Sequence, residues 1–238
     1  MTLYQTSHMF GFLSSISKEA VRDVQIFRGH IPANFGGRTS SVIELMSRSG
    51  NNYKYGGSLY GNLMSSGISA EIPILKKGSA IVNFRKSRPS NQFSKVYESI
   101  EKYMTVNNKF NLITETGEQN INQNTKYDLF SSYEDFFNRF SYLINSKHRA
   151  TFTLISSSDS IFEDRSYYGF SNILESDTAY IEEKNSFKNL GQSINIYSQW
   201  NNKYSTQLSI SNYSYENNYS SIQSSPQSNN ISIVGTAN

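Results

Sequence analysis

The chain has 238 residues, a formal net charge of +3 and no cysteine. So small a positive charge, spread along the chain, argues against nucleic-acid binding, and the lack of cysteine excludes a disulfide framework and a thiolate metal site. Aromatic residues make up 14% of the chain, with 17 Tyr and 15 Phe among abundant Ser and Asn. Disordered chains are poor in aromatic residues, so this composition favours strands whose two faces meet different surroundings.

The first 50 residues predict a small mixed unit. Residues 17–28 are typical of a short helix that runs into a strand, with Ser17 as the helix cap. Gly29 ends this strand, and Pro32, Gly36 and Gly37 then require irregular backbone before a second strand at 41–46. The polar stretch 47–52 marks a boundary, so we expect one domain at 1–50 and another at 51–238.

Beyond the boundary, apolar and polar residues alternate with a period of two, which indicates a sheet with one apolar face. The clearest run places Tyr204, Thr206, Leu208 and Ile210 against four intervening polar residues. The pattern predicts seven strands, near 53–62, 65–73, 78–87, 135–144, 149–157, 191–200 and 204–214. We expect the Ser- and Asn-rich residues 217–238 to lie outside the sheet.

The predicted links alternate in length. The links at 74–77, 145–148 and 201–203 are short, whereas those at 88–134 and 158–190 are long. The one exception is the link between the strands at 53–62 and 65–73, which is short although it lies at the same end of the sheet as the long loops. Short turns on one rim and long loops on the other are typical of outer-membrane barrels. Alternation by itself does not distinguish lipid from a protein core, so a soluble β-sandwich stays open as an alternative.

No run of about 18 apolar residues is present, and the segment after Met1 lacks the basic and apolar regions of a signal peptide. Barrel strands alternate apolar and polar residues, so they leave no such run. A barrel protein must be exported, and seven strands would form only part of a large barrel. We therefore expect the chain to be truncated at both ends.

Three stretches, residues 8–14, 20–24 and 27–42, resemble the end of the plug domain in TonB-dependent outer-membrane receptors. The similarity is closest to the subfamily with an N-terminal carboxypeptidase-regulatory-like domain. Its pattern of Pro-Ala, an aromatic residue, Gly-Gly-Arg and Ser-Ser-Val is matched at Pro32, Ala33, Phe35, Gly36, Gly37, Arg38, Ser40, Ser41 and Val42. Residues 57–61, 69–73 and 84–88 resemble the first barrel strands more weakly.

The resemblance implies a partial transmembrane antiparallel β-barrel of about seven strands, preceded by the C-terminal part of an α+β plug. It further implies TonB-dependent uptake of a small nutrient across the outer membrane, with no enzymatic step and no cofactor. The partners would be outer-membrane lipid, TonB through a missing N-terminal part, and a surface lipoprotein as in related systems. Two alternatives stay open: a cell-surface structural or adhesive β-protein, and the non-functional product of a truncated receptor gene.

The resemblance also suggests site residues. Plug arginines of the family pair with glutamates inside the barrel, so Arg38 is a candidate lock between plug and barrel, and the alternative is an arginine that only fixes the turn. Tyr167 and Tyr168 are candidate ligand-binding residues, because amphipathic rings suit recognition, although barrel girdles use the same residues. His8, His30 and His148 have no metal spacing and are interpreted as structural or exposed. The acidic pairs Glu134-Asp135, Glu163-Asp164 and Glu182-Glu183 fall in predicted loops or at a strand edge. Neighbours in an extended chain point to opposite faces, so these are poor acid/base pairs.

Overall fold

The computed structural model of the chain describes the backbone of residues 5–8, 11, 13–33, 35, 41–88, 95, 99, 111–114, 117–120, 125–168, 178–225 and 228–237. Side chains are described for these residues except 111–128, 165–168, 178–179 and those after 222. The described elements are antiparallel strands and one short 3-10 helix. The all-β class predicted from the period-two alternation is confirmed.

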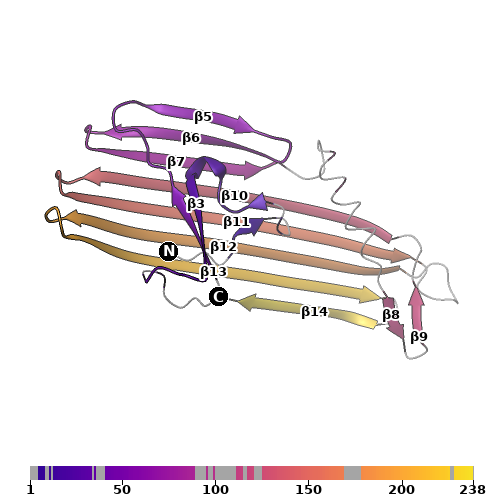
Figure 1. Ribbon diagram of the computed structural model, residues 1–238. Coiled ribbons are helices and arrows are strands. Elements are labelled where there is room, and N and C mark those ends of the chain that lie inside the picture. Colours follow the sequence, from indigo (N-terminus) through magenta and orange to yellow (C-terminus); the bar gives the residue numbers. More distant parts are fainter. Residues whose placement is uncertain are drawn as a thin grey trace.

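Most strands belong to one open antiparallel sheet with eight members in the order β14-β13-β12-β11-β10-β7-β6-β5 (Figure 1). The order follows the chain, because the β8–β9 hairpin (Asn111–Thr114 and Gly117–Asn120) is only an insertion between β7 and β10. The members are β5 (Gly56–Gly61), β6 (Ser65–Ile74), β7 (Gly78–Ser87), β10 (Thr125–Leu143), β11 (His148–Tyr168), β12 (Thr178–Gln199), β13 (Ser205–Ser225) and β14 (Ser228–Ala237).

The three predicted short links form tight turns at one end of this sheet (Figure 1). Between β6 and β7, the Lys77 N–H donates to the Ile74 backbone oxygen at 3.1 Å, and the two central residues of this turn, Leu75 and Lys76, adopt left-handed backbone with φ of 49° and 56°, as a primed turn requires. Between β10 and β11, the side-chain oxygen of Asn145 accepts hydrogen bonds from the backbone N–H groups of Lys147 and His148 at 2.9 and 3.0 Å. Asn201 repeats this arrangement between β12 and β13.

The later strands are about twice as long as predicted: β10, β11, β12 and β13 contain 19, 21, 22 and 21 residues. Much of the predicted long loop 158–190 is therefore paired strand, and the predicted tail 217–238 holds the end of β13 and all of β14. The prediction failed because these stretches carry few apolar residues. Alternation of apolar and polar residues marks a strand only where one face is apolar.

Two opposite faces of the sheet differ in chemistry. The face that carries the N-terminal residues, here called the covered face, presents Ser, Thr and Asn, the charged residues Arg85, Asp135, Arg139 and Asp159, and buried apolar residues such as Ile81 and Phe137. The other face, here called the open face, is exposed and carries an apolar row that crosses six strands. In order of pairing, the apolar row is Ile72, Ala80, Phe140, Phe152, Ile194 and Ile210.

Most apolar side chains of the open face lie in the half of the sheet near the tight turns, although Phe130, Phe162 and Ile222 lie on this face farther from the turns. Six residues further along β11, a polar row of the same face crosses the same strands: Ser66, Lys86, Glu134, Ser158, Lys188 and Glu216. The distance between the two rows is about 20 Å at the usual rise per residue. The open face is therefore divided into an apolar belt and a polar extension.

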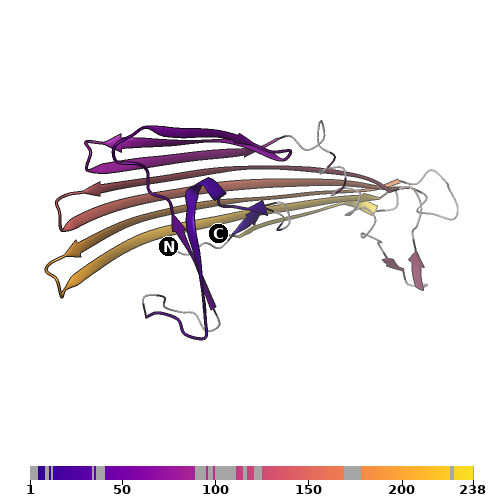
Figure 2. The ribbon, with the colours of Figure 1, turned by 45° about the horizontal axis from the view of Figure 1, so that its top comes forward.

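The described residues between 5 and 50, here called the N-terminal segment, lie against the covered face (Figures 1 and 2). The segment consists of β1 (Ser7–His8), β2 (Leu13–Ser14), the 3-10 helix η2 (Lys18–Ala20), β3 (Val21–Arg28) and β4 (Ser41–Ser47). The predicted helix and two strands are thus present, although the helix is a single turn. Ser17 makes no capping hydrogen bond to the backbone, and its hydroxyl donates to Glu19 at 2.6 Å instead.

Among the described residues, no helix is both long and apolar enough to cross a membrane.

Candidate functional site

His8, the last residue of β1, is buried where the N-terminal segment meets the covered face. His8 is 1% exposed. Its Nε2 lies 2.7 Å from Asp135 Oδ1 of β10, and its Nδ1 lies 3.3 Å from Asp159 Oδ2 of β11. A histidine placed between two carboxylates is favoured in its protonated form, in which both ring nitrogens carry a proton. This residue thus joins the segment to two neighbouring strands.

Two further side chains complete the His8 cluster, defined here as His8, Arg85, Tyr133, Asp135 and Asp159. Arg85 Nε donates to Asp135 Oδ2 at 2.7 Å, and its Nη2 donates to the backbone oxygen of Ser14 in the N-terminal segment. The Tyr133 ring stacks on the His8 ring with centroids 4.4 Å apart. The guanidinium carbon of Arg85 lies 5.3 Å from the centroid of the Tyr133 ring. When His8 is protonated, the positive charges of His8 and Arg85 balance the negative charges of Asp135 and Asp159.

The pKa of His8 reflects this balance. Burial lowers the pKa, since a charged imidazole loses hydration, but the hydrogen bond to Asp135 and the attraction of Asp135 and Asp159 raise it by more. The net effect is a pKa above the usual 6.5. Protonated His8 is therefore the form that the docked segment stabilises.

Apolar contacts lie beside the cluster. Ala20 of η2 packs with Ile81 of β7 and Phe137 of β10, which are all buried, and Ile16 and Ile155 pack against them. Nearby, Leu13 packs on Tyr133. Burial of this apolar surface favours docking of the segment, but it does not fix the orientation of the segment, because the hydrophobic effect is non-directional. The orientation of the segment is fixed by the polar contacts around this apolar surface.

Three more polar contacts hold the segment. The Tyr60 hydroxyl donates to Asn83 Oδ1 at 2.9 Å and also lies 3.1 Å from the Ser17 hydroxyl. Arg139 Nη1 donates to the backbone oxygen of Ser47 at 3.0 Å. Arg48 pairs with Glu71 of β6 at 3.1 Å, in a more exposed position. These contacts lie before β3 and at the end of β4, whereas much of the β3–β4 hairpin is exposed.

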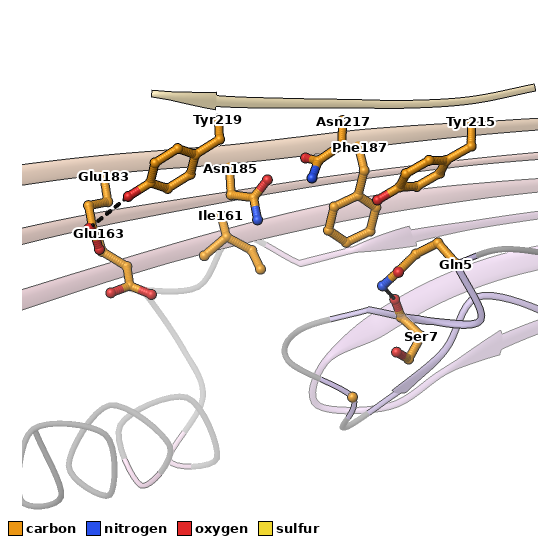
Figure 3. Close-up of a pocket in the computed structure, with 11 residues that line it drawn as sticks. Gln5, Ser7, Ile161, Glu163, Glu183, Asn185, Phe187, Tyr215, Asn217 and Tyr219 are labelled. Carbon is orange, nitrogen blue, oxygen red and sulfur yellow. Dashed lines mark hydrogen bonds between the residues drawn. The ribbon is translucent and has the colours of Figure 1, made fainter. Parts of the chain in front are cut away.

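A cavity of about 470 Å³ adjoins the His8 end of the segment (Figure 3). Its walls come from Gln5, Ser7 and Gly11 of the segment and from β11, β12 and β13 of the covered face. The sheet contributes Ile161, Glu163, Glu183, Asn185, Phe187, Tyr215, Asn217 and Tyr219. Glu163 and Glu183 lie in paired strands, so their predicted placement in a loop is wrong.

The residues proposed from the resemblance are only partly described. Gly29 follows β3 in left-handed backbone, with φ of 77°, and Ser41 begins β4 opposite Arg28. Pro32 lies in the link between these strands, where Phe27 and Phe35 have ring centroids 5.7 Å apart. Gly36, Gly37, Arg38 and Ser40 lie outside the described residues, as do the side chains of Tyr167 and Tyr168 at the end of β11. The Arg38 lock and the two tyrosines therefore stay predictions.

The contact that sequence reasoning missed is His8 with its two aspartates. His8 was placed correctly among structural residues, but nothing nearby in sequence indicates a partner, because Asp135 follows 127 residues later. Asp135 itself was set aside as the neighbour of Glu134. The two point to opposite faces of β10, and Asp135 is 5% exposed while Glu134 lies on the open face. In the described part of the chain, no group of three His, Asp or Glu side chains is arranged to hold a metal ion.

Comparison of the chain with protein-family models, with curated proteins and with solved structures gives no match.

Proposed function

We propose that the chain is part of a TonB-dependent outer-membrane receptor, which takes up a small nutrient across the outer membrane. The proposal that the chain spans the membrane rests on the apolar belt of the open face, which lies beside the tight turns and ends at the polar row. Exposed apolar surface of this extent is unfavourable in water. Ile194 and Ile210, for example, are 49% and 62% exposed.

The dimensions of the strands support this proposal. A tilted strand needs about 9–11 residues to cross the hydrocarbon of a bilayer. The 21 residues of β11 exceed this, and its first nine, from His148 to Ser156, span the apolar belt. Most of the remaining described side chains on the open face of β11 are polar, apart from Phe162, and this part of the strand would extend beyond the lipid on the side opposite the tight turns.

The receptor part of the proposal has a different support, the resemblance of residues 27–42 to the last part of a plug. In such a receptor, the N-terminal segment would act as part of the plug and the covered face as part of the barrel wall. The His8 cluster, the Tyr60 contacts and the Arg139 contact would then hold the plug at rest. Force transmitted by TonB would have to break these contacts before the nutrient passes.

A charge placed in the apolar belt tests the membrane part. Phe152→Arg in the apolar row should remove the protein from the outer-membrane fraction of the cells that produce it, because Arg near the membrane centre costs roughly 2–4 kcal/mol. Ser158→Arg, on the same face and strand but in the polar row, is the matched control and should leave the fraction unchanged. Recovery of the unmodified protein in the aqueous extract would favour the surface β-protein instead.

Accessibility of the segment tests the receptor part, and the absence of native cysteine makes the test specific. Ser17 is 2% exposed, so a Ser17→Cys variant should resist a water-soluble thiol reagent while the segment is docked. In a full-length receptor that includes the N-terminal part through which TonB acts, labelling of Ser17→Cys should rise in energised cells that contain TonB and stay low when the protonmotive force is removed. Asn51→Cys, at an exposed position, should label equally under both conditions. Identical labelling of Ser17→Cys with and without TonB would contradict the proposal.

A further inference from the structure

The three tight turns at one end of the large sheet carry a basic rim, defined here as Lys76, Lys77, Lys147 and Lys203 (Figure 1). Each turn contains one or two of these lysines, and all four are exposed. The described ion pairs include none of the four. Asp and Glu are absent from the turns and from the strand ends beside them, which are residues 74–78, 143–150 and 197–206. No carboxylate of the turns therefore offsets the positive charge of the rim.

Hydrogen bonds hold the three turns side by side. The Leu143 N–H donates to the Lys77 backbone oxygen at 2.8 Å, which joins the first turn to the end of β10. The Gln199 N–H donates to the Lys147 backbone oxygen at 2.8 Å, and Lys147 Nζ donates to the Trp200 backbone oxygen at 3.4 Å. Turns that are two strand spacings apart lie about 10 Å from each other, which is about one Debye length at 0.1 M salt. The lysines of separate hairpins thus act on the same surface.

Aromatic side chains lie along the strands between the apolar row and the basic rim. The Trp200 indole N–H donates to Thr206 Oγ1 at 2.9 Å, and the His148 ring packs edge-on against the Trp200 ring with centroids 5.2 Å apart. Trp200 and Tyr204 nevertheless are 54% and 67% exposed. Rings with an apolar body and a polar end are favoured where hydrocarbon meets headgroups.

The polar extension of the open face has a different charge pattern. Lys86 of β7 pairs with Glu134 of β10 at 3.5 Å. Lys188 of β12 lies directly opposite Glu216 of β13 in the register. At these two positions a carboxylate offsets the charge of the lysine, in contrast to the basic rim.

We infer that the basic rim binds the headgroup layer of a bilayer that contains anionic phospholipid. Along the strands, the apolar belt is followed by aromatic rings and then by lysines. This order matches the order of hydrocarbon, interface and negatively charged phosphate in such a lipid layer. A lysine side chain can keep its methylene groups near apolar surface while its ammonium group contacts phosphate. The inference rests on the membrane-spanning part of the proposed function, and it names the lipid on the side of the tight turns, which faces the periplasm in an outer-membrane barrel.

Vesicles of two compositions test the inference. Each lysine near an anionic surface strengthens binding roughly fivefold. The full chain, diluted from detergent, should therefore bind an equal mixture of phosphatidylcholine and phosphatidylglycerol on the order of 100-fold more tightly than phosphatidylcholine alone. Added salt should reduce this preference, because it screens the attraction. Trp200 is the only tryptophan in the sequence, so its fluorescence reports binding at the rim. Equal affinity for the two compositions would overturn the inference, and this comparison needs no variant.

Two double variants with the same change in charge then locate the contact. Lys147→Gln with Lys203→Gln removes two lysines of the rim and should reduce the preference for the anionic mixture roughly 10- to 30-fold. Lys184→Gln with Lys188→Gln is the matched control, because both lysines are exposed on the open face in the polar extension. The control should change the preference by less than about twofold, since its lysines lie more than a Debye length from the rim. An equal loss in both double variants would assign the preference to the overall charge of the chain and overturn the inference.

The outcome is separable from that of the proposed function, because bromine on the lipid acyl chains quenches a tryptophan at the hydrocarbon boundary whatever the charge of the lipid. Equal affinity and equal quenching in both compositions would keep the membrane-spanning proposal and remove the lipid preference of the rim. Preference for the anionic mixture without quenching, reversed by salt, would keep the rim as a headgroup-binding surface and remove the membrane span.

Discussion

His8 Nε2 lies 2.7 Å from Asp135 Oδ1, and the two residues are separated by 127 positions in the sequence. Asp135 also accepts hydrogen bonds from Arg85, which in turn donates to the backbone of Ser14. One carboxylate thus organises a charged cluster in which both the N-terminal segment and the sheet take part. Because the cluster is buried, its members depend on each other strongly.

Replacing His8 should release the N-terminal segment. His8→Ala leaves Asp159 and Asp135 without the cation that faces both, and loss of one partner from a buried charged pair costs about 3–5 kcal/mol. Limited proteolysis at Lys18 and Arg22 should become at least tenfold faster than in the unmodified protein. The large sheet should keep its strand content by circular dichroism, since none of its backbone pairs involves His8.

Two controls accompany this variant. His30→Ala changes an exposed histidine of the same segment and should leave cleavage unchanged. Arg48→Ala removes a partly exposed ion pair, which contributes at most about 1 kcal/mol, so cleavage should accelerate far less than in His8→Ala. If all three variants were cleaved at the same rate, the cluster would have no special part in docking.

Docking of the segment should weaken as the pH rises. The pKa of His8 is raised above 6.5 in the docked state, so the docked state binds the proton more tightly than the undocked state. The stabilisation is fully present below pH 6.5 and is lost as the pH rises through the raised pKa. The charged groups that face His8 are Asp135, Asp159 and Arg85.

Hydrogen exchange of the backbone amides in β1 and β2, followed across this pH range, measures the effect after correction for intrinsic exchange. In His8→Gln, which keeps a side chain able to form hydrogen bonds but does not titrate, the corrected protection should not change over the same range. A pH dependence that persists in His8→Gln would assign the effect to another group.

A methyl group at Gly78 should disturb the junction of β7 and β10. A Cβ built at this position lies 2.5 Å from the Ser141 backbone oxygen and 2.7 Å from the Tyr142 ring. The backbone oxygen has little freedom to move, so Gly78→Ala should lower the free energy of unfolding by about 1–3 kcal/mol. Gly56→Ala, also at the start of a strand, meets nothing closer than 3.6 Å and should be nearly neutral in urea denaturation.

The asparagine turns give a further prediction. Asn145→Ala removes the acceptor for the backbone N–H groups of Lys147 and His148, at a cost of about 1 kcal/mol. Asn145→Asp keeps a side-chain oxygen in the same place and should recover most of the loss. Equal midpoints of urea denaturation for the Ala variant and the unmodified protein would show that the turn holds without this side chain.

The fold was predictable wherever one face of a strand is apolar. The run 204–211 alternates cleanly, and it forms the first part of β13. The same strand continues through Tyr213, Tyr215 and Tyr219, where the other face carries Ser, Asn and Glu and the apolar signal is absent. Pairing with β12 and β14 keeps this part in the sheet. Cross-strand hydrogen bonds do not depend on side-chain polarity, so a single sequence does not report them.

The candidate site was less predictable than the fold. The motif at residues 32–42 drew attention to Arg38, but the charged contact described between segment and sheet centres on His8, whose partners lie on β10 and β11. The cavity residues Glu163 and Glu183 come together only through the register of β11 and β12. Spacing within one stretch of sequence carries no information about such pairs. A correct register of β11 and β12 would have brought Glu163 and Glu183 together, but no register within the large sheet places His8, which lies in β1.

The serial order of the sheet has a consequence for folding. From β11 to β14, each strand pairs with the one just before it in the chain, so the sheet grows by adding hairpins whose ends are already close. Such local pairing closes short loops and is kinetically favoured. The N-terminal segment is different, because it leaves the ribosome first yet its anchor at Asp135 follows 127 residues later. The N-terminal segment therefore docks after β10 and β11 have paired. Until then, the covered face of the growing sheet is exposed to other molecules.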